Sequence, residues 1–244
     1  MDPRNKTILI TGGGSGIGFA LAKRLADAGA TVVVSGRRAE QLAEAVKLCP
    51  ALKTLQGDVS TEAGRIALAE EVVAKYPALD VLVNNAGIQN RLPPLTEAQD
   101  WSRHALELST NLHAPMHLSM LLLPHLLKQK DAAIVNVSSG LAFVTIAFMP
   151  TYCATKAALH AFTMGLRKQL EKTSVKTIEI VPPMVNTGLG GKGLHDAGTP
   201  LDVYADDTFA RLVAGELEIG FGFSEKARKA SREELDQIFT TMNP

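Results

Sequence analysis

The chain alternates between short apolar runs rich in β-branched residues and longer segments whose apolar residues recur at helical spacing. The first pattern is typical of strands buried on both faces, and the second is typical of helices that cover a sheet. The apolar runs predict strands at 6–12, 31–36, 52–58, 79–87, 132–139 and 175–183. The intervening spacing predicts helices at 15–29, 38–48, 61–76 and 151–172, with further helical pattern across 100–130.

Strands and helices follow one another regularly enough to indicate one architecture. Apolar strands separated by helical crossovers form parallel sheets, and crossovers of this length give a doubly wound order. A chain of 244 residues is long enough for one large α/β domain and short for two. We therefore expect a single Rossmann-type α/β domain over 1–244, with a doubly wound parallel sheet flanked by helices.

Two segments depart from this alternation. Residues 186–200 contain five glycines and no hydrophobic period, so we expect a mobile loop at about 186–204 beside the substrate. The charged tail at about 224–241 is predicted to be helical. Its helix is expected to begin at Ser231, because Ser231 and Glu234 have the spacing of a capping box.

Composition excludes several classes of protein. The chain has 46% hydrophobic residues and a formal net charge of zero, which fits a packed domain and argues against a nucleic-acid-binding surface. The uncharged stretch 132–155 has the length of a membrane span, but Asn136, Ser138–Gly140 and Pro150 would place polar groups and helix breaks inside it. We therefore expect neither nucleic acid nor a membrane as a partner.

The two cysteines indicate a cellular compartment. Cys49 and Cys153 lie far apart and form no CxxC motif. Together with the lack of an apolar stretch at the start that would resemble a signal peptide, this favours a reducing, cytoplasmic location.

A glycine-rich stretch follows the first predicted strand and opens the first helix. It reads TGGGSGIG at 11–18 and fits GxxxGxG with Gly12, Gly16 and Gly18. Glycines let the backbone approach a pyrophosphate, and a helix N-terminus offers free N–H groups and the positive end of the helix dipole. A tight turn that needs positive φ is the structural alternative. We predict a dinucleotide site that includes Gly12, Gly14, Ser15, Gly16, Ile17 and Gly18.

The end of the second predicted strand bears on the choice of dinucleotide. An acidic residue there holds the ribose 2′-hydroxyl of NAD, whereas arginine pairs with the 2′-phosphate of NADP. Here the chain reads Ser35-Gly36-Arg37-Arg38. Arg37 and Arg38 favour NADP(H) over NAD(H), although one or both, Arg38 in particular, could simply open the next helix in solvent.

Tyr152 and Lys156 stand four residues apart in an alanine-rich helical segment, YCATKAALHAF. Positions i and i+4 lie about 5–6 Å apart on one helix face, so phenol and ammonium could act as a pair. The alternative is a core tyrosine beside a lysine that extends past it to water.

Taken together, these motifs and their order resemble the short-chain dehydrogenase/reductase family, in its compact single-domain form. The motifs are TGGGSGIG at 11–18, Gly57-Asp58-Val59, Asn84–Gly87, Asn111, Ser138-Ser139, Tyr152 with Lys156, and Pro182–Thr187. The stretches SSGLAFV and YCATKAALH and the C-terminal segment resemble the DltE-like subgroup of these oxidoreductases.

The resemblance implies a role for each matched position. Asn111, Ser139, Tyr152 and Lys156 would form the catalytic tetrad, with Asn111 reaching Lys156 through a water, and Lys156 would also hold the nicotinamide ribose. Further cofactor contacts would come from Asp58 and Val59 at the adenine, from Asn85, Ala86 and Gly87, and from Pro182, Val185 and Thr187 near the nicotinamide. Pro183 departs from the glycine common there, which removes an N–H group. Relatives assemble through long helices, so a homodimer or homotetramer is expected.

Electrostatics suggest how the tyrosine could work. A lysine cation about 4 Å away at an effective dielectric constant of about 20 would lower the pKa of a phenol from about 10 by at most about three units. Tyr152 would then be a general acid/base near neutral pH, while the Ser139 hydroxyl polarises the substrate oxygen.

The remaining polar residues give weaker indications. His113 and His117 have helical metal-ligand spacing, but no third ligand stands near them, so no metal site is expected. Arg91 and His195 flank the expected substrate cleft and could bind a carboxylate or phosphate, or lie in solvent. We expect an NADP(H)-dependent oxidoreductase of the carbonyl reductase or alcohol dehydrogenase type, acting on a small carbonyl compound and its alcohol. The alternatives are an NADP-dependent 3-hydroxy acid dehydrogenase, for which Arg91 would be the substrate cation, and a non-catalytic NADP-binding regulator.

Overall fold

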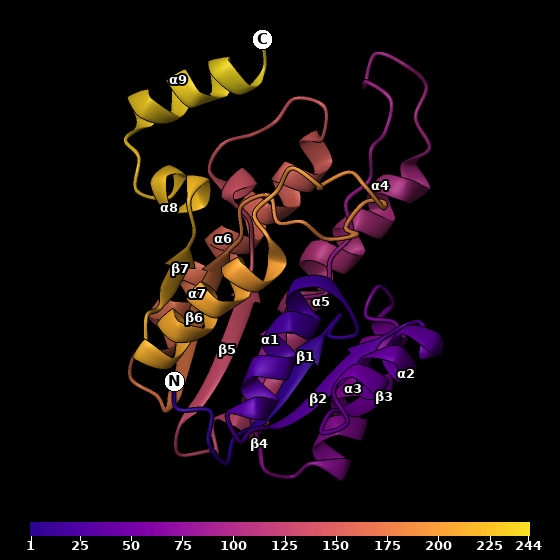
Figure 1. Ribbon diagram of the computed structural model, residues 1–244, viewed down its shortest axis with the longest axis vertical. Coiled ribbons are helices and arrows are strands. Elements are labelled where there is room, and N and C mark those ends of the chain that lie inside the picture. The colour runs from indigo at the N-terminus through magenta and orange to yellow at the C-terminus, as the bar shows by residue number, and fades with distance from the viewer.

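A computed structural model describes residues 1–244 and contains one parallel sheet of seven strands in the order β3-β2-β1-β4-β5-β6-β7. The strands are β1 Thr7–Thr11, β2 Thr31–Gly36, β3 Lys53–Gln56, β4 Leu79–Asn84, β5 Ala132–Val137, β6 Val175–Val181 and β7 Glu218–Gly220. Because helices lie on both faces, the predicted doubly wound Rossmann-type domain is confirmed (Figure 1).

The helices lie close to their predicted positions. They are α1 Gly16–Asp27, α2 Ala39–Leu48, α3 Glu62–Lys75, α4 Trp101–Leu108, α5 Ala114–Leu126, α6 Pro150–Leu170, α7 Leu201–Ala214, α8 Phe223–Ala227 and α9 Arg232–Met242. A π-helical turn, Ser109–His113, joins α4 to α5, and a 3-10 turn, Gly140–Ala142, follows β5. No helix is long and apolar enough to cross a membrane.

The core consists of two apolar layers separated by the sheet. Ile8 and Ile10 of β1 pack with residues of α1, α2 and α7, whereas Leu9 between them packs with residues of α3, α5 and α6. Alternate side chains of a strand point to opposite faces, so a strand buried on both sides must be apolar throughout. This is why the strands appear in the sequence as continuous apolar runs.

Three details differ from the sequence-based expectation. A seventh strand, β7, was not predicted, because its three residues are too few to show a period. The predicted loop 186–204 ends at residue 200, because α7 begins at Leu201 and buries Tyr204. The predicted tail helix is divided into α8 and α9, and the capping box of Ser231 and Glu234 is present at the start of α9.

The strand order places the predicted site residues together. β1 pairs with both β2 and β4, so the chain reverses its direction of winding at this point. Open α/β sheets bind ligands outside the carboxyl ends of the strands at such a switch point. The glycine loop leaves β1 here, and the segments that begin at Asn85, Ser138 and Pro182 leave β4, β5 and β6 at the same edge.

Two leucines on α2 test whether this packing supports the glycine loop. Leu42 is 4% exposed, and its Cδ2 lies 3.4 Å from where a Cβ of Gly14 would stand, whereas Leu48 is 68% exposed. We expect Leu42→Ala to lower the free energy of unfolding by about 2–4 kcal/mol and Leu48→Ala to change it by less than about 0.5 kcal/mol. Urea denaturation of the two variants checks this. Equal losses would show that Leu42 is not a core support.

Candidate active site

The glycine loop is tied directly to the segment that leaves β4. Gly12 has φ of +65°, and a Cβ there would stand 2.8 Å from the Ala86 Cα atom. The Asn85 side chain donates to the carbonyl oxygens of Thr11 and Gly12 at 2.9 and 3.2 Å. The Thr11 hydroxyl accepts from the N–H groups of Asn85 and Ala86 at 3.1 and 3.0 Å. Close backbone approach at Gly12 therefore requires glycine.

The start of α1 has the features of an anion site. Ser15 is the N-cap residue, and its side chain makes no capping hydrogen bond, so its hydroxyl is available to a ligand. Gly16, the first helical residue, has φ of +53°, and Gly14 has only ordinary contacts around its Cβ position. The free N–H groups of a 12-residue helix and its dipole favour a negative group there. Residues 12–18 thus fit the phosphates of a dinucleotide.

The two arginines after β2 differ in their surroundings. Arg38 is the N-cap residue of α2, and its Nη2 donates to Gln41 Oε1 at 2.7 Å. Arg37 is exposed, and its guanidinium makes no hydrogen bond or ion pair within the chain, although its carbonyl accepts from the Gln56 side chain at 2.9 Å. Of the two, Arg37 is the one free to meet a phosphate.

A buried arginine that the sequence did not single out organises the segment after β3. Arg65 of α3 donates through Nη1 to the Val59 carbonyl at 2.9 Å, while Asp58 Oδ1 accepts the Ser60 N–H at 2.9 Å. Arg65 Nε donates to His117 Nδ1 at 3.0 Å, which engages one of the two histidines considered as metal ligands. No group of three His, Cys, Asp or Glu side chains is placed to hold a metal ion.

Tyr152 and Lys156 both point inward from α6. Tyr152 is 6% exposed and Lys156 is 4% exposed, so the alternative of a lysine extending to water is wrong. Lys156 Nζ donates to the Val137 carbonyl at the end of β5 at 2.9 Å and lies 5.7 Å from the centroid of the Tyr152 ring. This bond joins α6 to the strand that delivers Ser139.

The other two predicted tetrad residues lie beside this pair. The Ser139 hydroxyl accepts the Leu141 N–H at 3.1 Å and is close enough to Tyr152 to act on the pKa of that phenol. Asn111 lies in the π-helical turn and exchanges two hydrogen bonds with the Ile88 backbone, both at 2.8 Å. A Cβ on Gly87 would stand 3.4 Å from Asn111 Oδ1 and 3.8 Å from Lys156 Nζ, so these two polar atoms face the same small space.

Burial controls the protonation of the site. It raises the pKa of Tyr152, and the nearby Ser139 hydroxyl only partly opposes this. Burial lowers the pKa of Lys156 to about 8, while the negative charges of Glu107 and Glu179 act in the opposite direction. The expected lowering of the Tyr152 pKa by Lys156 is therefore not found. The physical reason is burial, which disfavours the charged phenolate, while the Lys156 ammonium bonds to the Val137 carbonyl.

Sequence reasoning missed these two buried carboxylates. Glu107 of α4 is 1% exposed and accepts the Asn90 N–H through Oε1 at 2.9 Å, and burial raises its pKa. Glu179 of β6 is also 1% exposed. The signal for Glu179 was present in the run VKTIEIV, because a charge inside a strand buried on both faces must have partners.

The segment after β6 passes close to the glycine loop. The Pro182 carbonyl accepts the Gly140 N–H at 2.9 Å, and Val185 is bridged to Thr199 and buried. The Thr187 Cγ2 atom lies 3.6 Å from where a Cβ of Gly16 would stand. These contacts hold 182–187 beside the start of α1, where the resemblance expects the nicotinamide end of the cofactor.

Two glycine substitutions test the close approach at the loop. Gly12→Ala places a methyl group against Ala86 and an alanine in the left-handed conformation of residue 12. We therefore expect it to lower the free energy of unfolding by about 2–4 kcal/mol. Gly165 lies within α6 with nothing within 4 Å of its Cβ position, and Gly165→Ala should stabilise by about 0.5–1 kcal/mol. Chemical denaturation measures both. A neutral Gly12→Ala would contradict the packing described here.

The buried lysine makes stability depend on pH in a defined direction. The pKa of Lys156 falls from 10.5 to about 8 on folding, so its charge destabilises the folded state fully below about pH 8 and ceases to do so above about pH 10.5. Relative to Lys156→Met, we expect the wild type to gain about 2 kcal/mol of unfolding free energy between pH 7 and pH 10. Denaturation at both pH values measures this.

Lys168→Met on the same helix is the control, because the Lys168 side chain is 78% exposed. Its difference from the wild type should stay nearly constant between the same two pH values. A Lys156→Met difference that is equally constant would show that Lys156 is not buried as a charge.

Comparison with known proteins gives a consistent result. The protein-family model for short chain dehydrogenases matches residues 6–197 of this chain. An uncharacterised oxidoreductase, DltE, of Bacillus subtilis strain 168 is 46% identical, across 100% of this chain and 98% of that protein. A short-chain dehydrogenase from Burkholderia cenocepacia J2315, solved in complex with NADP, is 25% identical with a TM-score of 0.82, and the match covers 98% of this chain and 99% of that one.

A gluconate 5-dehydrogenase from the same Burkholderia strain, solved with NADP and tartrate, is 30% identical with a TM-score of 0.70, covering 77% of this chain and 75% of that one. The family match spans most of the chain, and the Bacillus relative is matched from end to end. This protein therefore belongs to the short-chain dehydrogenase/reductase family, as an oxidoreductase of the DltE-like type that uses a nicotinamide cofactor.

Proposed function

We propose that the protein is an NADP(H)-dependent oxidoreductase that interconverts a small carbonyl compound and its alcohol, with Tyr152 as the general acid/base. The observation that supports this most is the buried arrangement on α6. Tyr152 lies close enough to Ser139 for the two hydroxyl groups to interact, and Lys156 lies on the same helix face beside Asn111. A structural tyrosine and lysine would not require this convergence of polar groups from three separate segments.

The reaction needs a hydride, which the nicotinamide cofactor supplies when bound. The protein's own residues would manage the proton. Because burial raises the pKa of Tyr152, the phenol stays protonated at neutral pH and can donate to the alkoxide that forms on the substrate. The Ser139 hydroxyl would stabilise that developing negative charge, since it lies close to Tyr152.

Lys156 has properties suited to resupplying the proton. Its pKa of about 8 lies close to neutral pH, where a general acid exchanges protons most effectively. Asn111 Oδ1 and Lys156 Nζ lie around Gly87, and Asn111 is anchored at both ends by Ile88. A water held between them would continue the proton path, as the resemblance to the family implies.

Turnover and cofactor binding can be separated in one experiment. Purified protein is mixed with NADPH and a panel of small ketones, keto esters and keto acids, and the absorbance of the reduced nicotinamide is followed. We expect Tyr152→Phe to lower kcat by at least about 100-fold, because the phenolic proton is lost, while the Kd for NADPH changes little. Wild-type protein that binds NADPH but consumes none with any carbonyl would favour the non-catalytic regulator.

The preference for NADP(H) is proposed from the free guanidinium of Arg37 and is supported by the NADP complex of the Burkholderia relative. We expect Arg37→Gln to raise the KM for NADPH by about 10–100-fold and to leave the KM for NADH nearly unchanged. Arg38→Gln is the matched control and should have the smaller effect, because Arg38 bonds to Gln41. Equal KM values for NADPH and NADH in the wild type would contradict the assignment.

A second candidate, a 3-hydroxy acid dehydrogenase, is favoured by one observation. Arg91 makes no ion pair or hydrogen bond through its side chain, and its guanidinium carbon lies 5.7 Å from the centroid of the Phe148 ring. Burial and the charge of Arg91 lower the pKa of His195, so the two groups that flank the expected cleft are also near each other. An unpaired cation beside an aromatic ring suits a carboxylate substrate.

Matched substrates distinguish the two candidates. If a carboxylate is recognised, a 3-oxo acid should show a lower KM than its methyl ester, and Arg91→Gln should raise the KM for the acid at least about 10-fold without changing that for the ester. Steady-state kinetics with both substrates measures this. Equal effects on acid and ester would leave the neutral carbonyl compound as the substrate.

Two further expectations remain proposals. Exposed Trp101, Met120 and Met164 lie on α4, α5 and α6, which supports association of copies into a homodimer or homotetramer. Cys49 and Cys153 are both free and buried, which supports a reducing, cytoplasmic location.

A further inference from the structure

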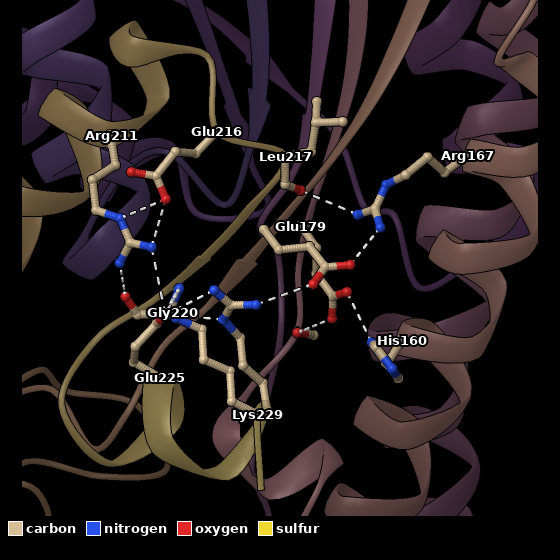
Figure 2. A network of polar contacts seen from close by, with 12 residues as sticks. His160, Arg167, Glu179, Arg211, Glu216, Leu217, Gly220, Glu225 and Lys229 are labelled. Atoms are coloured by element: carbon tan, nitrogen blue, oxygen red, sulfur yellow. Dashed lines mark hydrogen bonds and ion pairs between the residues drawn. The ribbon is translucent and has the colours of Figure 1, made fainter.

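A carboxylate is buried on β6, next to the strand that leads to Ser139. Glu179 of β6 is 1% exposed, and its carboxylate has two partners. Ser138 Oγ donates to one oxygen at 2.5 Å, and His160 Nδ1 lies 2.8 Å from the other (Figure 2). A buried charge is costly unless it is paired and hydrogen-bonded, and Glu179 meets both conditions.

The partners of Glu179 come from the two segments that carry Ser139, Tyr152 and Lys156. Ser138 directly precedes Ser139 at the exit of β5, and His160 follows Lys156 by four residues on α6. Glu179 therefore connects the end of β5 to α6 through its contacts with Ser138 and His160. The hydrogen bond from Lys156 to the Val137 carbonyl connects the same two elements, one helical turn before His160 on α6.

We propose that Glu179 and His160 act as positioning residues. They hold the Ser139 segment against α6, and the carboxylate of Glu179 supplies a fixed negative charge that acts on Lys156. This inference rests on the proposed function, because it concerns how the same site is maintained. Glu179 and His160 contact each other, and Glu179 also contacts Ser138, so both act on the tetrad through these contacts.

Charges around the pair come from several elements. Glu179 hydrogen-bonds to His160 and raises its pKa, and Glu218 of β7 acts in the same direction, whereas Arg167 of α6 opposes it. The Phe143 ring packs on the imidazole, with the ring centroids 4.6 Å apart. Around Lys156, the charged groups are Glu107 of α4 and Glu179.

These charges determine how the effect of Glu179 and His160 on Lys156 changes with pH. When the pH rises above the pKa of His160, the imidazole becomes neutral and no longer compensates the charge of Glu179. The carboxylate then acts at full strength on Lys156, in the range where the lysine itself begins to lose its proton at about pH 8. Glu179 thus extends the pH range in which Lys156 stays charged.

A neighbouring network provides a matched control. Figure 2 shows Arg167, Arg211, Glu216, Glu225 and Lys229 in a polar network next to Glu179 and His160. Glu218 takes part in it, with ion pairs to Arg167 and Arg228 at 2.5 and 3.2 Å, and its side chain is 36% exposed. Glu218→Gln removes a carboxylate from the same region without removing a partner of Ser138 or His160.

Direct titration of Lys156 tests the proposal without requiring turnover. In full-length protein labelled with ¹³C-lysine, the Lys156 resonance is assigned by its loss in Lys156→Met. We expect Glu179→Gln, which keeps the size of the side chain and an acceptor for Ser138, to lower the Lys156 pKa by about one unit. The shift is expected because Glu179 is one of the two carboxylates whose charge raises the Lys156 pKa. Glu218→Gln should shift it by less than about 0.3 units.

The pH profile of kcat supplies a second readout. The basic limb should move to lower pH by the same amount in Glu179→Gln, while the Kd for NADPH measured by fluorescence at pH 6.5 stays within about twofold of the wild type. An unchanged Lys156 titration in folded Glu179→Gln, or a loss of kcat that is equal at every pH, would overturn the proposal. If no carbonyl is reduced but the Lys156 titration shifts, the proposed function fails and the positioning role stands.

His160→Gln keeps the inference testable if Glu179→Gln does not fold. It leaves the carboxylate in place without a cation that can compensate it. We therefore expect the Lys156 pKa in His160→Gln to be equal to or higher than in the wild type, opposite in sign to the effect of removing Glu179. A fall in the Lys156 pKa of His160→Gln would overturn the electrostatic part of the proposal.

Discussion

The hydrogen bond from Lys156 to the Val137 carbonyl is the contact on which the site depends. An ammonium group that is 4% exposed is costly, as its lowered pKa shows, and it is retained here by a carbonyl dipole and by two buried carboxylates. Because the acceptor lies at the end of β5, this bond fixes α6 against the strand that leads to Ser139. The relative position of Tyr152 and Ser139 follows from it, since Tyr152 is one helical turn before Lys156.

The parallel sheet makes this arrangement possible. Its strands all end at one edge, so the glycine loop after β1 and the polar segments after β4, β5 and β6 meet there. Gly12 lets the glycine loop approach Ala86 closely, and the Asn85 side chain donates a hydrogen bond to the Thr11 carbonyl of that loop. Substitutions at this edge are therefore expected to affect both stability and function, because polar groups stand where apolar side chains could pack.

The sequence was most informative where local chemistry determines structure. Strands buried on both faces are continuous apolar runs, which is why the sheet was predicted well, and the capping box at Ser231 was recognisable from its spacing. β7 was missed because three residues carry no period. The pKa of Tyr152 was misjudged because it depends on burial in three dimensions. Glu107 and Arg65 were missed because only the fold reveals that their helix faces are covered.

The proposed function requires a direct transfer of hydride between NADP(H) and carbon at this site. It can be tested by a reaction with NADPH carrying deuterium on the transferable position of the nicotinamide, followed by mass spectrometry of the alcohol formed. We expect one deuterium on the carbinol carbon in the wild-type product. An alcohol that forms without deuterium from either labelled face of the cofactor would contradict it.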